Sequence, residues 1–197
     1  MKRPDATTNR RLDQGGAPVP TTEMNLLSAL ARTARTLPDK PFLRHQGQTI
    51  TYGQALERSR RAAALLASQG VGAGDRVALV CFNTPGFIDA MFGAWRLGAA
   101  AVPVNHKLAA PEIEYILQHC GAKAVVFDAA LAPVLDKVRS TAARFTTAGG
   151  APSIQDFDAL LAATAEGIDG PAVDEGAVAE ILYTSGTTGK PKGCLHS

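Results

Sequence analysis

Short apolar runs alternate with helical patterns through the middle of this chain, and this alternation limits the folds that are open to it. The runs at residues 76–81, 100–104 and 124–127 show too little polar alternation for half-exposed strands and are typical of strands buried on both faces. An amphipathic pattern of helical period separates each run from the next. Strands that alternate with helices through short connections predict a mainly parallel sheet with helices on both faces. We therefore expect an α/β fold.

The first part of the chain precedes this alternation. Residues 1–21 are polar, with one glycine pair and several prolines, and predict a flexible tail. Leu27, Leu30 and Ala34 then recur at helical spacing and predict a first helix, which stops before Pro38. A β-hairpin is expected over residues 41–52, since two short strand patterns flank a glycine-containing turn.

Capping residues mark the boundaries of the later helices. Threonine or serine before an apolar stripe supplies an N-cap, proline is favoured at the first helical positions, and glycine is favoured just past the last turn. The predicted starts are Thr51 with Gln54 in capping-box spacing, Thr84 with Pro85, Pro111, and Ser153. The predicted ends are Gly70, Gly98 and Gly121.

Beyond residue 127 the pattern is less regular. A helix is expected between Leu131 and Val138, and a short strand at residues 144–147. Residues 167–175, which contain a proline and several acidic side chains, predict a surface loop. A last strand is expected at residues 179–183.

This last strand leads into a segment of glycines, hydroxyls and lysines. It reads Tyr183-Thr184-Ser185-Gly186-Thr187-Thr188-Gly189-Lys190-Pro191-Lys192-Gly193. Glycines let the backbone approach an anion closely, hydroxyl and N–H groups donate to phosphate oxygens, and lysine adds a positive charge. Open α/β sheets bind ligands beyond the carboxyl ends of their strands. The segment therefore predicts a polyphosphate-binding loop.

Two other interpretations of the segment are less favoured. A Walker A loop needs four residues between its glycines and a Ser or Thr after its lysine, whereas Gly186 and Gly189 are two residues apart and Pro191 follows Lys190. This spacing disfavours a P-loop kinase or NTPase. A flexible Gly/Ser/Thr linker has no reason to follow a buried-strand pattern and then to carry Lys-Pro-Lys-Gly.

The segment resembles the signature phosphate loop of the adenylate-forming superfamily, which includes acyl-CoA synthetases, aryl-CoA ligases, luciferases and peptide-synthetase adenylation domains. All the fixed positions of that signature are present. The resemblance extends from about residue 25 to residue 197 and includes residues 51–56, 74–78 and 95–105. Asn105 and Leu108, which follow the strand at 100–104, favour the acyl-CoA ligase branch over the peptide synthetases.

The resemblance implies a reaction and a set of ligands. The whole enzyme would bind ATP with Mg²⁺, join a carboxylic acid to AMP with release of pyrophosphate, and transfer the acyl group to coenzyme A. The candidate residues for ATP phosphate binding are Thr184, Ser185, Gly186, Thr187, Thr188, Gly189, Lys190 and Lys192. No catalytic or metal-binding residue of the family maps onto this chain. An adenylation domain that loads a carrier protein, and a non-catalytic nucleotide-binding module completed by a partner chain, are the alternatives.

Members of this superfamily are several hundred residues long, and this chain has 197 residues. The resemblance therefore implies an N-terminal fragment, in which residues 22–197 form an incomplete adenylation domain and the mobile C-terminal domain is absent. We expect this chain alone to be inactive, because the acyl pocket and the catalytic lysine of the family lie in the parts it lacks.

Net charge, the length of the apolar runs and the cysteine spacing argue against several kinds of partner and site. A net charge of +2 gives no reason to expect nucleic acid or an anionic membrane as a partner. No apolar run is long enough for a transmembrane helix or a secretory signal. Cys81, Cys120 and Cys194 fit neither a disulfide framework nor a metal site, and the histidines show no ligand spacing. We expect a cytoplasmic protein with reduced thiols, Cys81 and Cys120 being buried and Cys194 more exposed.

Overall fold

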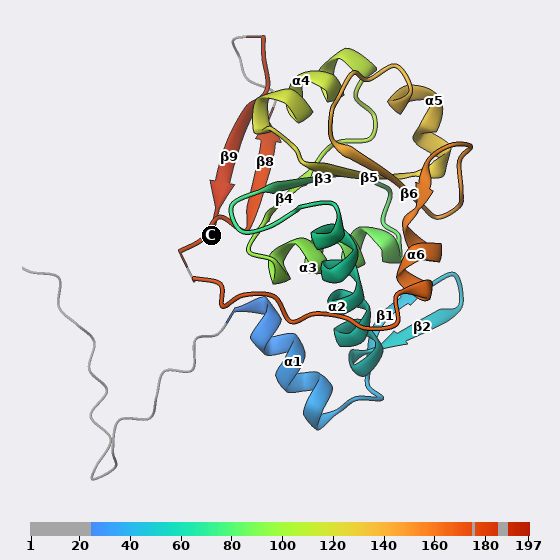
Figure 1. The fold of residues 1–197 in the computed structure, drawn as a ribbon, viewed down its shortest axis with the longest axis vertical. Coiled ribbons are helices and arrows are strands. Elements are labelled where there is room, and N and C mark those ends of the chain that lie inside the picture. Colours follow the sequence, from blue (N-terminus) through green and yellow to red (C-terminus); the bar gives the residue numbers. More distant parts are fainter. Residues whose placement is uncertain (1–24, 175, 185–188) are drawn as a thin grey trace, which may run out of the picture.

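A seven-stranded sheet with helices on both faces dominates the structure, a computed structural model that describes residues 25–174, 176–184 and 189–197 (Figure 1). The strands are β1 Pro41–His45, β2 Gln48–Thr51, β3 Arg76–Val80, β4 Ala100–Pro103, β5 Ala124–Asp128, β6 Ala143–Thr147, β7 Gln155–Asp156, β8 Glu180–Thr184 and β9 Lys192–His196. The helices are α1 Leu26–Thr36, α2 Tyr52–Ser68, α3 Pro85–Arg96, α4 Ala110–Cys120, the 3₁₀ turn η1 Ala129–Leu131, α5 Ala132–Leu135 and α6 Phe157–Ala163. The tail expected at residues 1–21 lies outside the described residues.

The large sheet has the strand order β7-β6-β5-β3-β4-β8-β9. The pairs from β7 through to β8 are parallel, and only β8 and β9 pair antiparallel. The prediction of a mainly parallel sheet is therefore confirmed. The predicted hairpin at residues 41–52 is also confirmed as the small sheet of β1 and β2.

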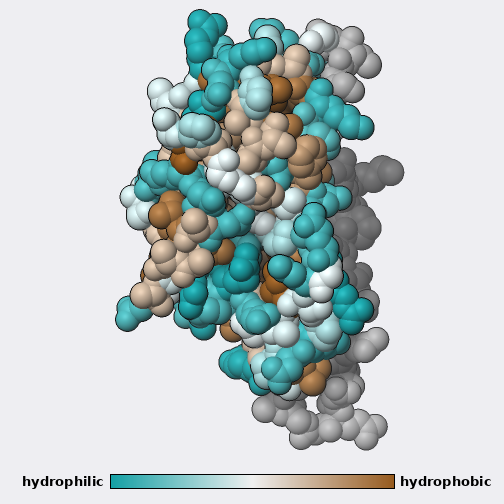
Figure 2. Space-filling model, turned by 90° about the vertical axis from the view of Figure 1, so that its right-hand side faces the viewer, coloured by the Kyte–Doolittle hydropathy of each residue, from teal (hydrophilic) through white to brown (hydrophobic). Residues whose placement is uncertain are grey.

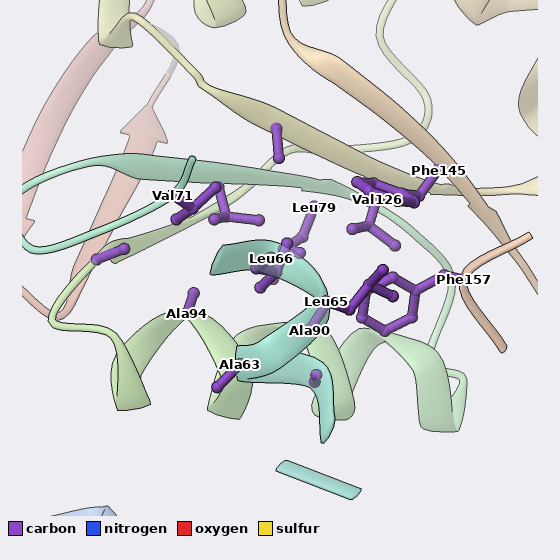
Figure 3. Packing of buried hydrophobic residues seen from close by; sticks show 14 of the residues in the cluster. Ala63, Leu65, Leu66, Val71, Leu79, Ala90, Ala94, Val126, Phe145 and Phe157 are labelled. Carbon is purple, nitrogen blue, oxygen red and sulfur yellow. The ribbon is translucent and has the colours of Figure 1, made fainter. Parts of the chain in front are cut away.

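Two apolar layers explain why the central strands are apolar at nearly every position. Val77 and Leu79 of β3 face one cluster with α2, α3 and α6, while Ala78 and Val80 face the other with α4 and α5. Figure 1 shows these two sets of helices on opposite sides of the sheet. In the first layer, Leu79 lies between the sheet and Leu66 of α2 (Figure 3). Burial on both faces removes the alternation that a half-exposed strand would need.

Most predicted helix boundaries are confirmed. Thr51 and Gln54 form the expected capping box, in which the Gln54 backbone N–H donates to Thr51 Oγ1 and the Thr51 N–H donates to Gln54 Oε1. Gly98 and Gly121 follow α3 and α4 with φ of 72° and 62°, the left-handed conformation that glycine adopts without strain.

Two predicted caps differ from the structure. Ser153 does not begin a helix; α6 begins at Phe157, and the Asp156 side chain accepts the capping hydrogen bond from the Ala159 N–H at 3.0 Å. Gln155 and Asp156 pair with β6 as strand β7, and Ser153 has a φ of 63°, so the helix starts only after them. Thr84 does precede α3, but its side chain makes no capping bond, and its buried Oγ1 has no hydrogen-bond partner among the described residues.

The predicted surface loop crosses helices α2 and α3 and is held there by charge. The buried guanidinium of Arg96 donates to Ser59 Oγ at 3.0 Å and to Asp169 Oδ1 at 2.9 Å, and Arg60 Nε donates to the same Asp169 oxygen at 2.7 Å. A Cβ added to Gly170 would lie 1.9 Å from the Arg96 carbonyl oxygen. This segment therefore lies directly on the helices before the chain enters β8.

The surface is mixed in character. Figure 2 shows a face on which hydrophilic residues surround small apolar patches. The most exposed large apolar side chains of the described residues, Leu195 and Leu26, belong to β9 and α1. Within the part of the chain that the structure describes, every helix is too short or too polar to cross a membrane.

Candidate functional site

The predicted phosphate-binding segment occupies the turn between β8 and β9. The strand expected at residues 179–183 is β8, which runs on to Thr184. Ser185, Gly186, Thr187 and Thr188 lie outside the described residues. The chain resumes at Gly189, whose φ of 95° is one that residues with side chains rarely adopt.

The two described ends of this segment lie side by side. Strand β9 returns antiparallel along β8, with Thr184 paired to Lys192 and Tyr183 paired to Gly193. A Cβ on Gly193 would lie 3.0 Å from Ile181 Cγ2, so glycine suits this close approach. The candidate residues Thr184 and Lys192 therefore face each other at the carboxyl end of the parallel sheet, where open α/β sheets place their ligands.

Sequence analysis did not identify β9. Each of its five residues is exposed, and the strand has no apolar face of period two. Its extended conformation comes from pairing with β8, and the pattern of apolar residues along the sequence does not report such pairing. Gly189 and Pro191 favour a turn, and this is the sequence signal that a second strand could follow β8.

Helix α4 touches this hairpin through two aromatic side chains. Lys190 Nζ lies 5.4 Å from the centroid of the Tyr115 ring, and Tyr115 OH lies 3.4 Å from the Pro191 carbonyl oxygen. One turn further along α4, His119 Nδ1 lies 2.7 Å from Tyr183 OH. The imidazole of His119 also stacks on the Tyr115 ring, with centroids 5.3 Å apart. These four side chains connect β8, α4 and the start of β9.

The sequence analysis found no ligand spacing among the histidines and did not single out Tyr115. The available signal was the i, i+4 spacing of Tyr115 and His119, which places both on one face of α4. That face lies beside the buried stripe of Ile113, Ile116 and Leu117, so both rings reach the edge of the core near β8.

Tyr183 and the two lysines of the segment differ in burial and in charge. Partial burial, with smaller contributions from Cys120 and Tyr115, raises the pKa of Tyr183 to about 12, so its hydroxyl stays protonated at neutral pH. Lys190 and Lys192 are both exposed. Among the described residues, neither lysine makes a salt bridge, and Lys190 Nζ lies over the Tyr115 ring.

A buried carboxylate lies at the carboxyl end of β5, the neighbour of β3 in the sheet. Asp128 ends β5 and is buried, and one of its carboxylate oxygens accepts a hydrogen bond from the Phe82 N–H just after β3. The other oxygen has no partner among the described residues, and burial raises the pKa of this carboxyl. The Asp128–Phe82 bond links the loops that follow two adjacent strands.

The three cysteines lie in different environments. Cys81 is buried and its thiol donates to the Val126 carbonyl oxygen, and burial raises its pKa well above the usual range. Cys194 on β9 is exposed, as expected. Cys120, the last residue of α4, was expected to be buried but is only partly so.

The fold and this hairpin match a known family. Residues 30–197 fit the family model described as AMP-binding enzyme. The chain belongs to this family. The resemblance of residues 183–193 to the adenylate-forming signature is thereby confirmed at the level of the family.

Relatives within the family include CoA ligases. The chain is 42% identical over 153 residues to the long-chain-fatty-acid–CoA ligase FadD13 of Mycobacterium tuberculosis, covering 75% of this chain and 29% of that protein. It is 35% identical over 183 residues to the long-chain-fatty-acid–CoA ligase of Thermus thermophilus, covering 89% of this chain and 34% of the relative. The chain therefore spans about a third of the length of these curated relatives.

Solved structures agree with the family assignment. The inhibitor-bound N-terminal domain of FACL13 from Mycobacterium tuberculosis superposes with a TM-score of 0.74 at 36% identity, over 87% of this chain and 44% of that one. The anthranilate CoA ligase AuaEII in complex with anthranoyl-AMP gives a TM-score of 0.82 over 88% of this chain and 35% of that one. At 24% identity, AuaEII supports the fold alone.

Proposed function

We propose that this chain supplies the ATP-binding part of an AMP-forming ligase, which activates a carboxylic acid as an acyl-adenylate and passes the acyl group to coenzyme A. The observation that carries the proposal is the β8–β9 hairpin, in which Thr184 and Lys192 lie opposite each other at the carboxyl end of the parallel sheet. Membership of the AMP-binding enzyme family and the CoA ligases among its relatives support it.

In the reaction, the part of the hairpin is electrostatic. The substrate carboxylate attacks the α-phosphorus of ATP, the bond to the bridging oxygen breaks, and pyrophosphate leaves with increased negative charge. We assign Thr184, Ser185, Thr187 and Thr188 as hydroxyl donors to the β- and γ-phosphates, with Lys192 as a cation. Gly186 and Gly189 let the backbone approach the phosphates, and Mg²⁺ arrives with ATP as part of the substrate.

The second half-reaction replaces AMP by a thiol. The sulfur of coenzyme A attacks the acyl carbon, AMP leaves with its phosphate oxygen, and a thioester forms. We propose a fatty or aryl carboxylic acid as the substrate class, because Asn105 and Leu108 favour the acyl-CoA ligase branch and a relative at 42% identity is named as a long-chain-fatty-acid–CoA ligase. We propose the cytoplasm as its location.

An exchange assay tests this proposal. Radiolabelled pyrophosphate is incubated with ATP, Mg²⁺ and a panel of fatty, aryl and amino acids, with the 197-residue chain and, where the reading frame runs on past Ser197, with the extended chain. We expect acid-dependent exchange in the extended chain and none in the 197-residue chain. Turnover by the 197-residue chain alone would contradict the expectation that it needs further parts. Exchange in neither form, together with ATP binding, would favour a non-catalytic nucleotide-binding module.

The acceptor thiol is tested separately. A fatty acid–[acyl-carrier-protein] ligase, ScoC of Streptomyces coeruleorubidus, is 34% identical over 160 residues, so a carrier protein is the alternative acceptor. After exchange identifies the acid, coenzyme A and a phosphopantetheinylated carrier protein are offered in parallel. We expect AMP release to depend on coenzyme A.

A further inference from the structure

The two lysines of the phosphate-binding segment lie in different surroundings. Lys190 Nζ lies over the ring of Tyr115, 5.4 Å from its centroid, whereas Lys192 lies on β9 opposite Thr184. An ammonium group at this distance from an aromatic face is attracted by the negative charge of the ring face. Pro191 between them has a fixed φ, which limits how far the two side chains can converge on one phosphate.

The Tyr115 ring is itself held in place. It stacks on His119 with centroids 5.3 Å apart, and its hydroxyl lies 3.4 Å from the Pro191 carbonyl oxygen. His119 in turn contacts Tyr183 OH at 2.7 Å, and Tyr183 belongs to β8. The stacked rings of Tyr115 and His119 therefore contact the hairpin at two places, at Tyr183 on β8 and at Lys190 and Pro191 just before β9.

We propose that Tyr115 is a positioning residue for the entry into β9: its ring binds Lys190 and fixes the start of β9, so that Lys192 is the lysine that contacts the ATP phosphates. The proposal rests on the proposed function, since it assigns roles within that site. Lys190 then serves as an anchor between the segment and α4. Tyr115 acts through the segment and does not itself contact the nucleotide.

The first test detects the contact itself. The chain is labelled with [¹³C]lysine, and the Lys190 side-chain signals are identified by their loss in Lys190→Arg. A methylene group near the face of an aromatic ring is shifted upfield by the ring current. We expect such a shift in the unsubstituted chain and in Tyr115→Phe, which keeps the ring, and its loss in Tyr115→Leu.

The chain offers an internal control for this test. Lys40 Nζ lies 6.0 Å from the centroid of Tyr52, on a different part of the surface. The Lys40 signals should be unchanged in Tyr115→Leu. A Lys190 side chain at unshifted positions in the unsubstituted chain would overturn the proposal, whatever the chain binds.

The second test separates the two lysines by the affinity for MgATP, measured by titration calorimetry on the 197-residue chain. A lost charge-assisted hydrogen bond costs about tenfold or more in binding, whereas a lost exposed cation–π contact costs about two- to fivefold. We expect the larger loss in Lys192→Ala and the smaller one in Lys190→Ala and Tyr115→Leu, with Tyr115→Phe unchanged. The double variant Lys190→Ala/Tyr115→Leu should bind as either single variant does, because both remove one contact.

The outcomes distinguish this proposal from the proposed function. A Lys190→Ala loss as large as that of Lys192→Ala, or additive losses in the double variant, would overturn the roles given to the two lysines. If neither the unsubstituted chain nor its extended form binds MgATP, the proposed function and the assignment of Lys192 both fail, while the ring-current shift still decides the Tyr115–Lys190 contact. Thermal unfolding of each variant shows whether the fold is kept.

Discussion

Strands β5 and β9 belong to the same sheet and have opposite surroundings. All five residues of β5 are buried, whereas all five residues of β9 are exposed. Two layers of helices cover β5, while β9 lies at the edge of the sheet and pairs with β8. The comparison teaches that apolar burial specifies the fold in the centre of the sheet. Polar chemistry and a few aromatic contacts specify the hairpin that carries the candidate site.

The largest expected loss of stability comes from a substitution in the centre of the sheet. Phe127 of β5 is fully buried, and Phe127→Ala should lower the free energy of unfolding by about 3–5 kcal/mol through lost burial and a residual cavity. Urea unfolding followed by circular dichroism measures this change. The matched control is Leu195→Ala on β9, where the side chain is 65% exposed and the expected change is within about 0.5 kcal/mol. Equal losses at the two positions would contradict the comparison.

A second substitution tests the packing of the helices that cover the centre. A Cβ added to Gly93 of α3 would lie 2.7 Å from the Ala62 Cβ of α2. Gly93→Ala should therefore destabilise the fold by about 1–3 kcal/mol, although alanine is the better helix former. The shift in the midpoint of urea unfolding measures this loss of stability. A midpoint that rises would mean that α2 and α3 are not in close contact here.

Thiol chemistry should distinguish the same two regions without changing stability. Cys81 follows β3 and is buried with a raised pKa, and Cys194 on β9 is exposed. Thiolate is the reactive form, so a disulfide reagent at pH 8 should modify one thiol rapidly, and Cys194→Ser should abolish this fast phase. The pKa of Cys120 is also raised by burial, so its reaction should be slower. A fast phase that persists in Cys194→Ser would show that β9 is not the exposed edge.

The smallest effect concerns Tyr183, where the two regions meet. Its pKa is raised to about 12 from 10 by partial burial, so the folded state favours the protonated phenol. The resulting stability is fully present below pH 10 and is lost as the pH rises through about 12. Phenolate absorbance should show a component near pH 12 that is missing in Tyr183→Phe. A titration identical in the two proteins would contradict burial of this hydroxyl.

The sequence predicts the centre of this molecule better than its edge. Strands β3, β4 and β5 are recognisable because burial on both faces requires apolar residues throughout, and Thr51, Gly98 and Gly121 mark helix ends by local backbone chemistry. The predicted start of α6 was wrong because Ser153 and Asp156 are both good caps, and the pairing of Gln155 and Asp156 with β6, a tertiary contact, places the start at Phe157.

At the candidate site, the sequence identified the segment but not what surrounds it. Thr184 ends β8, Gly189 and Lys190 lie between the two strands, and Lys192 begins β9, while their role in phosphate binding stays a prediction. The contact with Tyr115 was not predictable, since this residue is separated from Lys190 by four strands and several helices along the chain. Only the tertiary structure brings α4 to the hairpin.

Whether the β8–β9 hairpin binds the phosphates of ATP is tested most directly by nuclear magnetic resonance. MgATP is titrated into the ¹⁵N-labelled chain, and the amide shifts of Thr184, Gly189 and Gly193 are compared with those of β5. We predict saturable shifts at the hairpin, and β5 amides that stay in place. Shifts confined to other parts of the sheet, or none at a millimolar concentration of nucleotide, would contradict the account.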